Sequence, residues 1–330
     1  MMSRTAKLSI TWLIGLIIVI VLPHIVGIVY TNVLVTFMMD SVFALSVNLL
    51  LGFTGLLSFG QAMFFGVGGY AAALALTHIP GFPLMGVIFV SGFAGFILSC
   101  IVAPVLCRIT GTAFAMLTLA FGMLTYVICL KFREITGGED GIVGFDIPPL
   151  NLGFTSIDIC DPTNFYYFAL VVLGVVAFFM WWLVKTPFGT VLISIRDNAQ
   201  RADYLGYQVK HSKALVIIIS GTMAGFVGGV YALFHNLVST DGALTVFVSF
   251  TPLMASYIGG VGNFVGPIVG SGILHILDEL TSRFTERVDL VNGIVFIIVV
   301  MYAPMGAVGA WWSIQEWFLK KIRKAQEENS

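Results

Sequence analysis

Charged residues are scarce in this chain. Only 10% of its 330 residues are Asp, Glu, Lys or Arg, whereas 58% are hydrophobic and the mean hydropathy is +0.99. A soluble domain carries about 25% charged residues. The composition therefore excludes an ordinary soluble protein and indicates an integral membrane protein. A formal net charge of -1 also gives no reason to expect a nucleic acid as partner.

Signatures of catalysis and of metal binding are missing as well. The chain contains no HExxH, no GxSxG and no phosphate-binding GxxxxGK[ST] motif. Its five histidines are scattered singly, and its four cysteines form no CxxC pair. We therefore expect no enzyme, no cofactor and no metal site in this chain. If ATP drives the protein, another chain must hydrolyse it.

Long apolar runs are abundant instead. Those long enough to cross a bilayer fall near residues 9–30, 33–51, 61–78, 84–106, 112–130, 165–184, 213–235 and 289–309. A glycine-rich region, 246–281, is interpreted as two further short spans that are broken at 259–267. The sequence thus predicts an all-α, polytopic membrane helix bundle of about ten spans, forming one domain over residues 1–330. The first run imitates a signal peptide, but its length and the lack of a cleavage site favour a retained span.

The distribution of basic residues predicts the orientation. Lys and Arg concentrate in the two terminal segments and in the central loop, and they are rare in the alternate loops. By the positive-inside rule, both termini are cytoplasmic. We then expect an external loop at 131–164, a cytoplasmic coupling loop at 185–212 and a cytoplasmic tail at 311–330.

The central loop carries helix signals although it is polar. Thr186 is suited to cap a helix that has Pro187 at its first position. Asp197 is predicted to cap a second short helix, which Gly206 would end in a left-handed conformation. We expect Ala199, Ala202 and Leu205 to share one side of this second helix. Its size suits a docking element for a partner protein.

A few polar residues fall within or between the predicted spans. Asp40 is the one charged residue that we place deep inside a span, so it is a functional candidate. The alternative is that Asp40 hydrogen-bonds to a neighbouring helix or lies nearer the membrane interface; for Asn48 this alternative is favoured. Ser58 and Gln61 belong to a glycine-rich stretch, 55–62, which is either a bent piece that lines a cavity or a tight turn. Together, Asp40, Asn48, Ser58 and Gln61 are our candidates for a translocation path.

Glycine recurs every four residues in two of the predicted spans. The two series are Gly221, Gly225, Gly229 and Gly262, Gly266, Gly270. Small residues at this spacing let helix backbones approach closely in a membrane. We favour close helix packing over a direct role in a pathway.

Several ordered motifs resemble one protein family. They are Ala44–Ala62 followed by Gly66 and Gly69-Tyr70, Thr136–Ile142, Thr186–Gly189, Ile195–Asn198 with Ala202, Leu205-Gly206 and Lys213, Ala224-Gly225 to Tyr231-Ala232, Ile258–Gly262 with Gly266-Pro267, and Pro304–Gly306. Over residues 35 to 310 the chain is similar to the inner-membrane permease subunits of branched-chain amino acid ABC transporters, M type. The chain departs from the family pattern at Glu139, Thr190 and Ala199.

The resemblance implies a five-part importer of a prokaryotic cytoplasmic membrane. Its other parts are a second, related permease, two cytoplasmic ATPase subunits and an extracytoplasmic substrate-binding protein. It also implies a coupling helix that contacts an ATPase through Arg196, Asp197, Asn198, Arg201, Ala202, Leu205 and Gly206. Urea, short amides, aromatic acids and other small carboxylates are carried by similar permeases, so the cargo stays open. The competing hypotheses are an ion-coupled secondary transporter that uses Asp40 and, with no supporting residue set, a membrane-embedded enzyme.

Overall fold

The computed structural model describes residues 23–24, 27–79, 81–151, 156–285, 287–302 and 306–309, and most of them are helical. The long helices are α2 (Ile28–Thr54), α3 (Gln61–His78), α4 (Leu84–Leu106), α5 (Thr112–Lys131), α7 (Pro162–Lys185), α10 (Val209–His235), α12 (Val246–Gly259), α13 (Gly266–Ser282) and α14 (Val288–Tyr302). The short helices are α6 (Arg133–Thr136), α8 (Pro187–Asp197), α9 (Ala199–Tyr204) and α11 (Thr240–Ala243). The predicted all-α bundle is confirmed.

Six helical stretches in the described part of the chain are long and apolar enough to cross a membrane. They are Ile28–Thr54, Leu84–Leu106, Thr112–Lys131, Pro162–Lys185, Val209–His235 and Thr240–Gly259. Helices α3, α13 and α14 are not among them, and the predicted first span lies mostly outside the described residues. The number of ten spans therefore stays a prediction.

One predicted boundary is wrong. The sequence suggested that a first span ends at residue 30 and a second begins at 33, but α2 runs without interruption from Ile28. The break lies at Gly27, which has a φ of 81°. The Thr31 amide already donates to the Gly27 carbonyl at 3.1 Å, so the helix continues through the polar pair Thr31-Asn32.

Helix α10 is the centre of the larger part of the bundle, where it packs against α2, α3 and α4. Glycine allows the closest approach: a Cβ on Gly225 would lie 2.8 Å from the Ser91 carbonyl oxygen and 3.1 Å from the Gly95 Cα. Gly68 of α3 meets the backbone of the same Gly225. At this level the backbones of α3, α4 and α10 are therefore in direct contact.

The chain between α2 and α3 is not helical, yet it is buried. Residue Gly55 ends α2 in the left-handed conformation, with a φ of 70°. Leu56 and Ser58 are buried, and the Phe59 amide donates to the Thr118 hydroxyl of α5 at 3.2 Å. Non-helical backbone is tolerated in a membrane only where protein or a cavity surrounds it. The stretch is therefore a buried, non-helical segment that starts with a left-handed turn at Gly55 and contacts Thr118 of α5.

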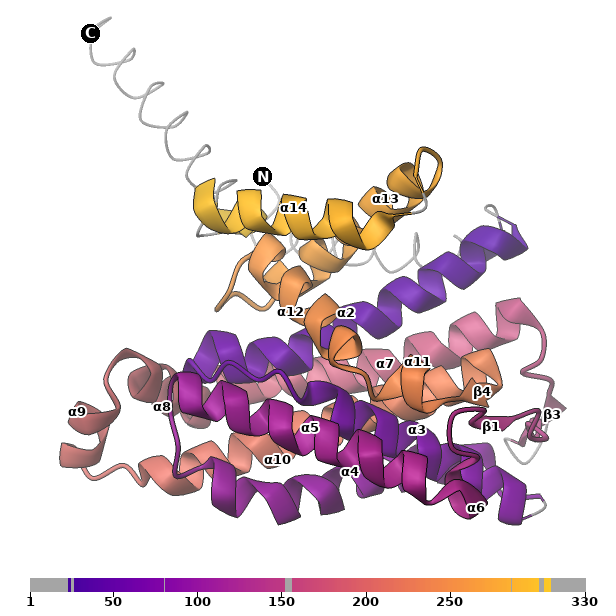
Figure 1. The fold of residues 1–330 in the computed structure, drawn as a ribbon, viewed down its shortest axis with the longest axis horizontal. Coiled ribbons are helices and arrows are strands. Elements are labelled where there is room, and N and C mark those ends of the chain that lie inside the picture. Colours follow the sequence, from indigo (N-terminus) through magenta and orange to yellow (C-terminus); the bar gives the residue numbers. More distant parts are fainter. Residues whose placement is uncertain are drawn as a thin grey trace, which may run out of the picture.

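The predicted break in the glycine-rich region is confirmed. Helix α12 ends at Gly259 and α13 begins at Gly266, and the two helices form a hairpin that packs on α2. A small hydrophobic core of Ala44, Met254, Ala255, Ile258 and Leu274 joins the three helices. In Figure 1 the hairpin and α14 lie apart from the layer that contains α3, α4, α5 and α10.

The two polar loops lie at opposite ends of the bundle (Figure 1). Helices α8 and α9 occupy one end, called here the α8–α9 end. The other, the α6–β1 end, holds two small antiparallel sheets. Strand β1 (Ile142–Val143) pairs with β4 (Leu237–Val238), and β2 (Leu150–Asn151) pairs with β3 (Ser156–Ile157).

The close contact at Gly225 can be tested. We expect Gly225→Val to destabilise the protein by about 1–3 kcal/mol, because overpacking forces the backbones of α4 and α10 apart. Gly174→Val is the matched control, since a Cβ at Gly174 of α7 would meet nothing within 4 Å. The measurement is the melting temperature of each variant in detergent, and equal values for the two variants would contradict the packing.

Candidate functional site

Asn48 holds the α12–α13 turn against α2. Its side-chain nitrogen donates to the Asn263 carbonyl at 2.9 Å, and its oxygen accepts from the Gly262 amide at 3.2 Å. Asn48 is only 1% exposed. Both ends of the amide are therefore used to satisfy the non-helical backbone of the turn, which is the hydrogen-bonded alternative that the sequence favoured.

Gln61 plays a comparable part at the start of α3. Its nitrogen donates to the Ser220 hydroxyl of α10 at 2.7 Å, and that hydroxyl donates to the Ser46 carbonyl of α2 at 2.7 Å. The next amide, that of Ala62, donates to the Ser249 hydroxyl of α12 at 2.8 Å. One buried polar network thus joins α2, α3, α10 and α12 where α3 begins. The predicted path residue Ser58 is also buried, and its hydroxyl has no hydrogen-bond partner among the described residues.

Asp40 lies near the middle of α2 and faces α13. One of its carboxylate oxygens is 3.4 Å from Nε2 of His275, and its side chain is 38% exposed. The structure therefore brings Asp40 to a histidine partner, whereas Asn48 and Gln61 belong to separate hydrogen-bonded groups. The four predicted path residues do not form one cluster.

The two predicted helices of the central loop are present, but the second is capped by a different residue than the one predicted. Helix α8 begins at Pro187, as expected. Helix α9 is capped by Asn198, whose side-chain oxygen accepts from the Arg201 amide at 2.9 Å, and not by Asp197. The reason is that α8 runs through Asp197, whereas Asn198 has the extended backbone of a cap. The Asp197 carboxylate instead accepts from Arg196 Nε at 3.3 Å and Nη2 at 3.2 Å. Gly206 follows α9 with a φ of 88°, as predicted.

The predicted apolar side of α9 is divided between two environments. Ala202 is buried, but Leu205 is 70% exposed and its neighbour Tyr204 is 90% exposed. Leu205 lies past the last helical residue, so the side of the helix does not determine where it points. The tip of the loop therefore presents an aromatic and an aliphatic side chain away from the bundle.

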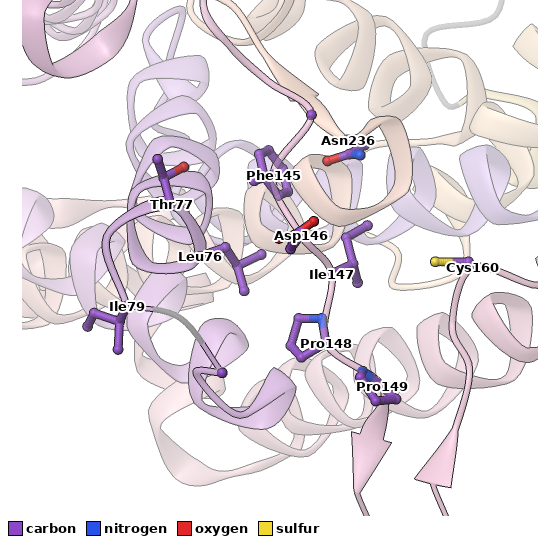
Figure 2. A pocket seen from close by; sticks show the side chains of 12 residues that line it. Leu76, Thr77, Ile79, Phe145, Asp146, Ile147, Pro148, Pro149, Cys160 and Asn236 are labelled. Atoms are coloured by element: carbon purple, nitrogen blue, oxygen red, sulfur yellow. The ribbon is translucent and has the colours of Figure 1, made fainter.

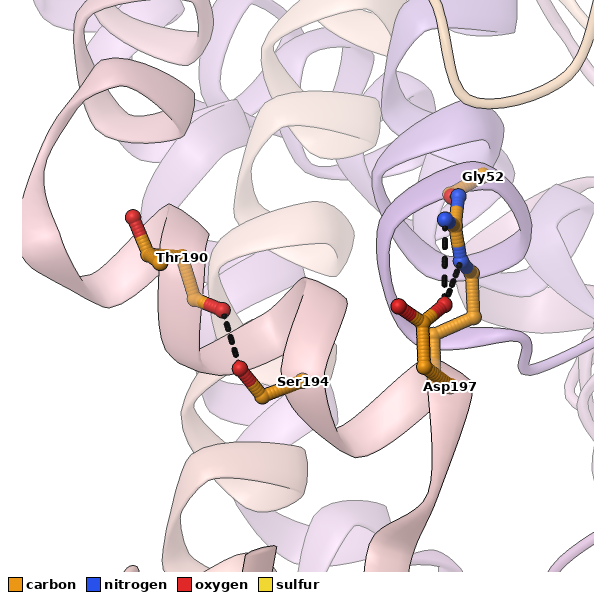
Figure 3. Close-up of polar contacts among 5 residues, drawn as sticks. Gly52, Thr190, Ser194 and Asp197 are labelled. Carbon is orange, nitrogen blue, oxygen red and sulfur yellow. Dashed lines mark hydrogen bonds and ion pairs between the residues drawn. The ribbon is translucent and has the colours of Figure 1, made fainter.

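Arg196 connects this loop to the rest of the bundle, and Figure 3 labels two of its partners, Gly52 and Asp197. Its Nη1 donates to the Gly52 carbonyl in the last turn of α2 at 2.7 Å. The same Nη1 would lie 2.9 Å from a Cβ on Gly262, so the guanidinium also adjoins the α12–α13 turn that Asn48 holds. One side chain thus joins α8, α2 and the turn between α12 and α13.

A cavity of about 640 Å³ opens at the α6–β1 end (Figure 2). Asn236, Asp146 and Cys160 are among the residues around it. Partial desolvation and the hydrogen-bonded Asp158 side chain raise the pKa of the Cys160 thiol, which lowers its thiolate fraction at neutral pH. None of the four predicted path residues lines this cavity.

Sequence reasoning missed the partners that give these residues their roles. His275 and Gly52 lie far from Asp40 and Arg196 in the sequence, and no motif marked the pairs. A signal did exist for His275, because α13 also carries Asp278 three residues later and so has a polar stripe. No group of three or more His, Cys, Asp or Glu residues that could hold a metal occurs within the described residues.

Broken, internally hydrogen-bonded helices and a polar helical loop at one end of the bundle are typical of membrane transporters. The chain belongs to the family described as "Branched-chain amino acid transport system / permease component", which matches residues 29–301. It is therefore a multi-pass transport permease.

Named relatives agree with this assignment. The high-affinity branched-chain amino acid transport system permease protein LivM of Salmonella typhimurium is 28% identical over 92% of this chain and 76% of its own length. LivM of Escherichia coli is 28% identical over 80% of this chain and 66% of its own length. The fructose import permease protein FruG of Bifidobacterium longum is 26% identical over 72% of this chain and 74% of its own length. No solved structure matches the chain significantly.

The contribution of the Arg196–Gly52 hydrogen bond can be tested by measuring the stability of a variant. We expect Arg196→Met to lower the free energy of unfolding by about 1 kcal/mol, because a partly exposed charge-assisted hydrogen bond to Gly52 is lost. Arg201→Met is the control, since Arg201 is an exposed arginine of the same loop. Melting temperatures in detergent measure the effect, and an Arg196→Met protein as stable as the control would show that the connection contributes nothing.

Proposed function

We propose that this chain is the membrane-spanning subunit of a binding-protein-dependent ABC importer for branched-chain or related amino acids. The family match over residues 29–301 carries the proposal. In this proposal the chain pairs with a second, related permease, two cytoplasmic ATPase subunits drive it, and an extracytoplasmic binding protein delivers the cargo. The chain itself supplies a passage and no catalytic step.

The geometry of the α8–α9 end supports a role in contacting an ATPase. The exposed side chains of Tyr204 and Leu205 offer an apolar contact for an ATPase at the α8–α9 end. Arg196 then connects that contact to α2 and to the α12–α13 turn. Motion of a docked ATPase would reach the core of the bundle by this route. Of the predicted coupling residues between Arg196 and Gly206, Leu205 would thus contact the ATPase, and Arg196 would connect that contact to the bundle.

The orientation and the cargo belong to the same proposal. The α8–α9 end would face the cytoplasm, with both termini, and the α6–β1 end would face the binding protein, in a chain of about ten spans. The basic residues of the central loop support this orientation. Branched-chain amino acids are favoured because the family and LivM are named for them, whereas the name of FruG shows that one relative carries a sugar.

The first experiment is to tag the chain in its native cell, extract it in mild detergent and identify bound proteins by mass spectrometry. We expect two ATPase subunits and a second permease. Recovery of the chain alone, even after cross-linking at the exposed residue Tyr204, would refute the importer and favour a secondary transporter. The binding protein encoded beside the partners would then identify the cargo by titration with candidate amino acids.

The proposed contact between Leu205 and the ATPase can be tested by mutation. We expect Leu205→Asp to reduce uptake by about tenfold or more, because an uncompensated charge enters an apolar contact with the ATPase. Membrane insertion should remain intact. The measurements are uptake of radiolabelled cargo and the amount of ATPase that copurifies.

Ile135→Asp is the matched control, since it exchanges an exposed aliphatic residue for the same charge on α6, at the other end of the bundle. It should leave the copurified ATPase unchanged. Normal uptake by Leu205→Asp would show that this loop is not the coupling element.

A further inference from the structure

Lys213 is a buried cation without a partner in the described part of the chain. It lies in the second turn of α10 and is only 5% exposed. No ion pair or hydrogen bond joins its ammonium group to another described residue. A buried charge that loses its hydration and finds no partner is strongly unfavourable. Its Nζ atom is not fully enclosed, so an anion from outside the chain can reach it.

The contacts between α4 and α10 show what lies opposite Lys213. The two helices run in opposite directions, and glycines of α10 meet small residues of α4 at steps of four. The opposed pairs are Gly229 and Ser91, Gly225 and Gly95, and Gly221 and Ser99. Two further steps bring Lys213 opposite Cys107, the residue directly after the end of α4. In agreement, the Cys107 side chain is among the groups near the Lys213 ammonium.

The end of α4 does not need this ammonium as a donor. The last carbonyls of a helix usually lack a donor, and a lysine can bond to them. Here the carbonyls of Ala103, Val105 and Leu106 accept from the amides three or four residues later, at 2.9 to 3.4 Å. The Pro104 carbonyl accepts from the Cys107 thiol at 3.5 Å. Each of these carbonyls thus has a donor without Lys213.

Two further cations lie beside Lys213, and acids are scarce around them. Arg108 follows the end of α4, and Lys210 lies one turn before Lys213 on α10; both are exposed. Neither helix contains an acidic residue. Of the two acids in the loop before α10, one engages Arg196, and the other, Asp203, makes no ion pair with any residue that the structure describes. Arg108, Lys210 and Lys213 are called here the α4–α10 cation cluster.

Exposed apolar side chains continue from this cluster toward the middle of both helices. Ile101 and Val105 of α4 are 67% and 45% exposed, and Leu215 of α10 is 50% exposed. Both helices are long and apolar enough to cross a membrane. Basic residues between membrane helices bind the headgroups of anionic lipids. Cations beside exposed apolar side chains therefore suit a molecule that carries both a phosphate and acyl chains.

We propose that the α4–α10 cation cluster binds the phosphate of an anionic phospholipid, with Lys213 as the buried contact. The lipid belongs to the leaflet at the α8–α9 end, where α4 ends and α10 begins (Figure 1). Its phosphate neutralises Lys213, and its acyl chains cover the apolar side chains of α4 and α10. The contact holds the start of α10 directly after the central loop. This inference goes beyond the proposed function, and it depends on neither the cargo nor the ATPase.

The test uses the full chain, extracted from its own membrane with its bound partners and then stripped of lipid in detergent. The probes are dioleoyl phosphatidylglycerol, dioleoyl phosphatidylcholine and inorganic phosphate at equal ionic strength. We expect phosphatidylglycerol to raise the melting temperature, because a ligand of the folded state stabilises it. Phosphatidylcholine, which is zwitterionic, and free phosphate, which has no acyl chains, should raise it less. Native mass spectrometry measures the affinity for the bound lipid.

Lys213→Met removes the buried charge and keeps a side chain of similar shape. We expect it to bind phosphatidylglycerol about fivefold more weakly or worse, and to lose the rise in melting temperature. Without lipid it should melt no lower than the unmodified chain, because an unpaired buried charge is gone. Lys213→Arg keeps the charge and should retain most of the binding. Lys210→Met changes an exposed member of the cluster and should also weaken binding, so the test does not depend on one variant.

Lys185→Met is the matched control. It makes the same substitution at the same end of the bundle, but Lys185 belongs to α7 and its ammonium lies 3.8 Å from the centre of the Trp181 ring. It should bind phosphatidylglycerol as the unmodified chain does. Unchanged lipid binding in both Lys213→Met and Lys210→Met would overturn the inference, as would an equal loss in Lys185→Met.

The other probes distinguish other occupants of the cluster. An equal rise in melting temperature with free phosphate would assign the cluster to a soluble anion, and an equal rise with phosphatidylcholine would remove the selection by charge. Loss of copurified ATPase from Lys213→Met, with normal lipid binding, would assign the cluster to the ATPase. Each of these results overturns the lipid site and leaves the importer standing. A chain that binds phosphatidylglycerol through Lys213 but copurifies with no ATPase removes the importer and leaves the lipid site.

Discussion

Backbone hydrogen bonding inside an apolar medium is the constraint on which the rest of this structure depends. A helix satisfies its own amides and carbonyls, but an unpaired group in hydrocarbon costs several kcal/mol. This chain nevertheless interrupts its helices at residues 55–60 and 260–265. Each interruption is stabilised by side chains from other helices: Thr118 bonds to the first, and Asn48 bonds twice to the second.

The two interruptions are also connected to each other. Arg196 bonds to the last turn of α2, just before the first interruption, and its guanidinium adjoins the second. The contact is possible because Gly52 and Gly262 have no side chains to separate the backbones. A single cation on α8 therefore adjoins the two places where the bundle departs from regular helix. Such places are where a bundle can change shape at the lowest cost, since few helix bonds must break.

How far the sequence predicts the site differs from residue to residue. Pro187 and Gly206 act through local backbone geometry, so their positions in the helices of the central loop were predictable. Asp197 was predicted as a cap from its residue type, but Arg196 engages it and Asn198 caps instead. Local propensity could not choose between two adjacent capping residues, because the choice depends on where α8 ends, and α8 runs through Asp197.

By itself, the sequence determined the class of this protein: a helical membrane bundle with a polar helical loop and a glycine-rich break near residue 260. These features depend on hydropathy and local conformation, which act over one or two turns of chain. Only the tertiary structure decided that Asp40 faces His275, that Asn48 closes on the 260–265 turn, and that Lys213 is buried near the end of α4. These contacts join residues far apart in the sequence, and they depend on how closely the helices pack, which no local pattern specifies.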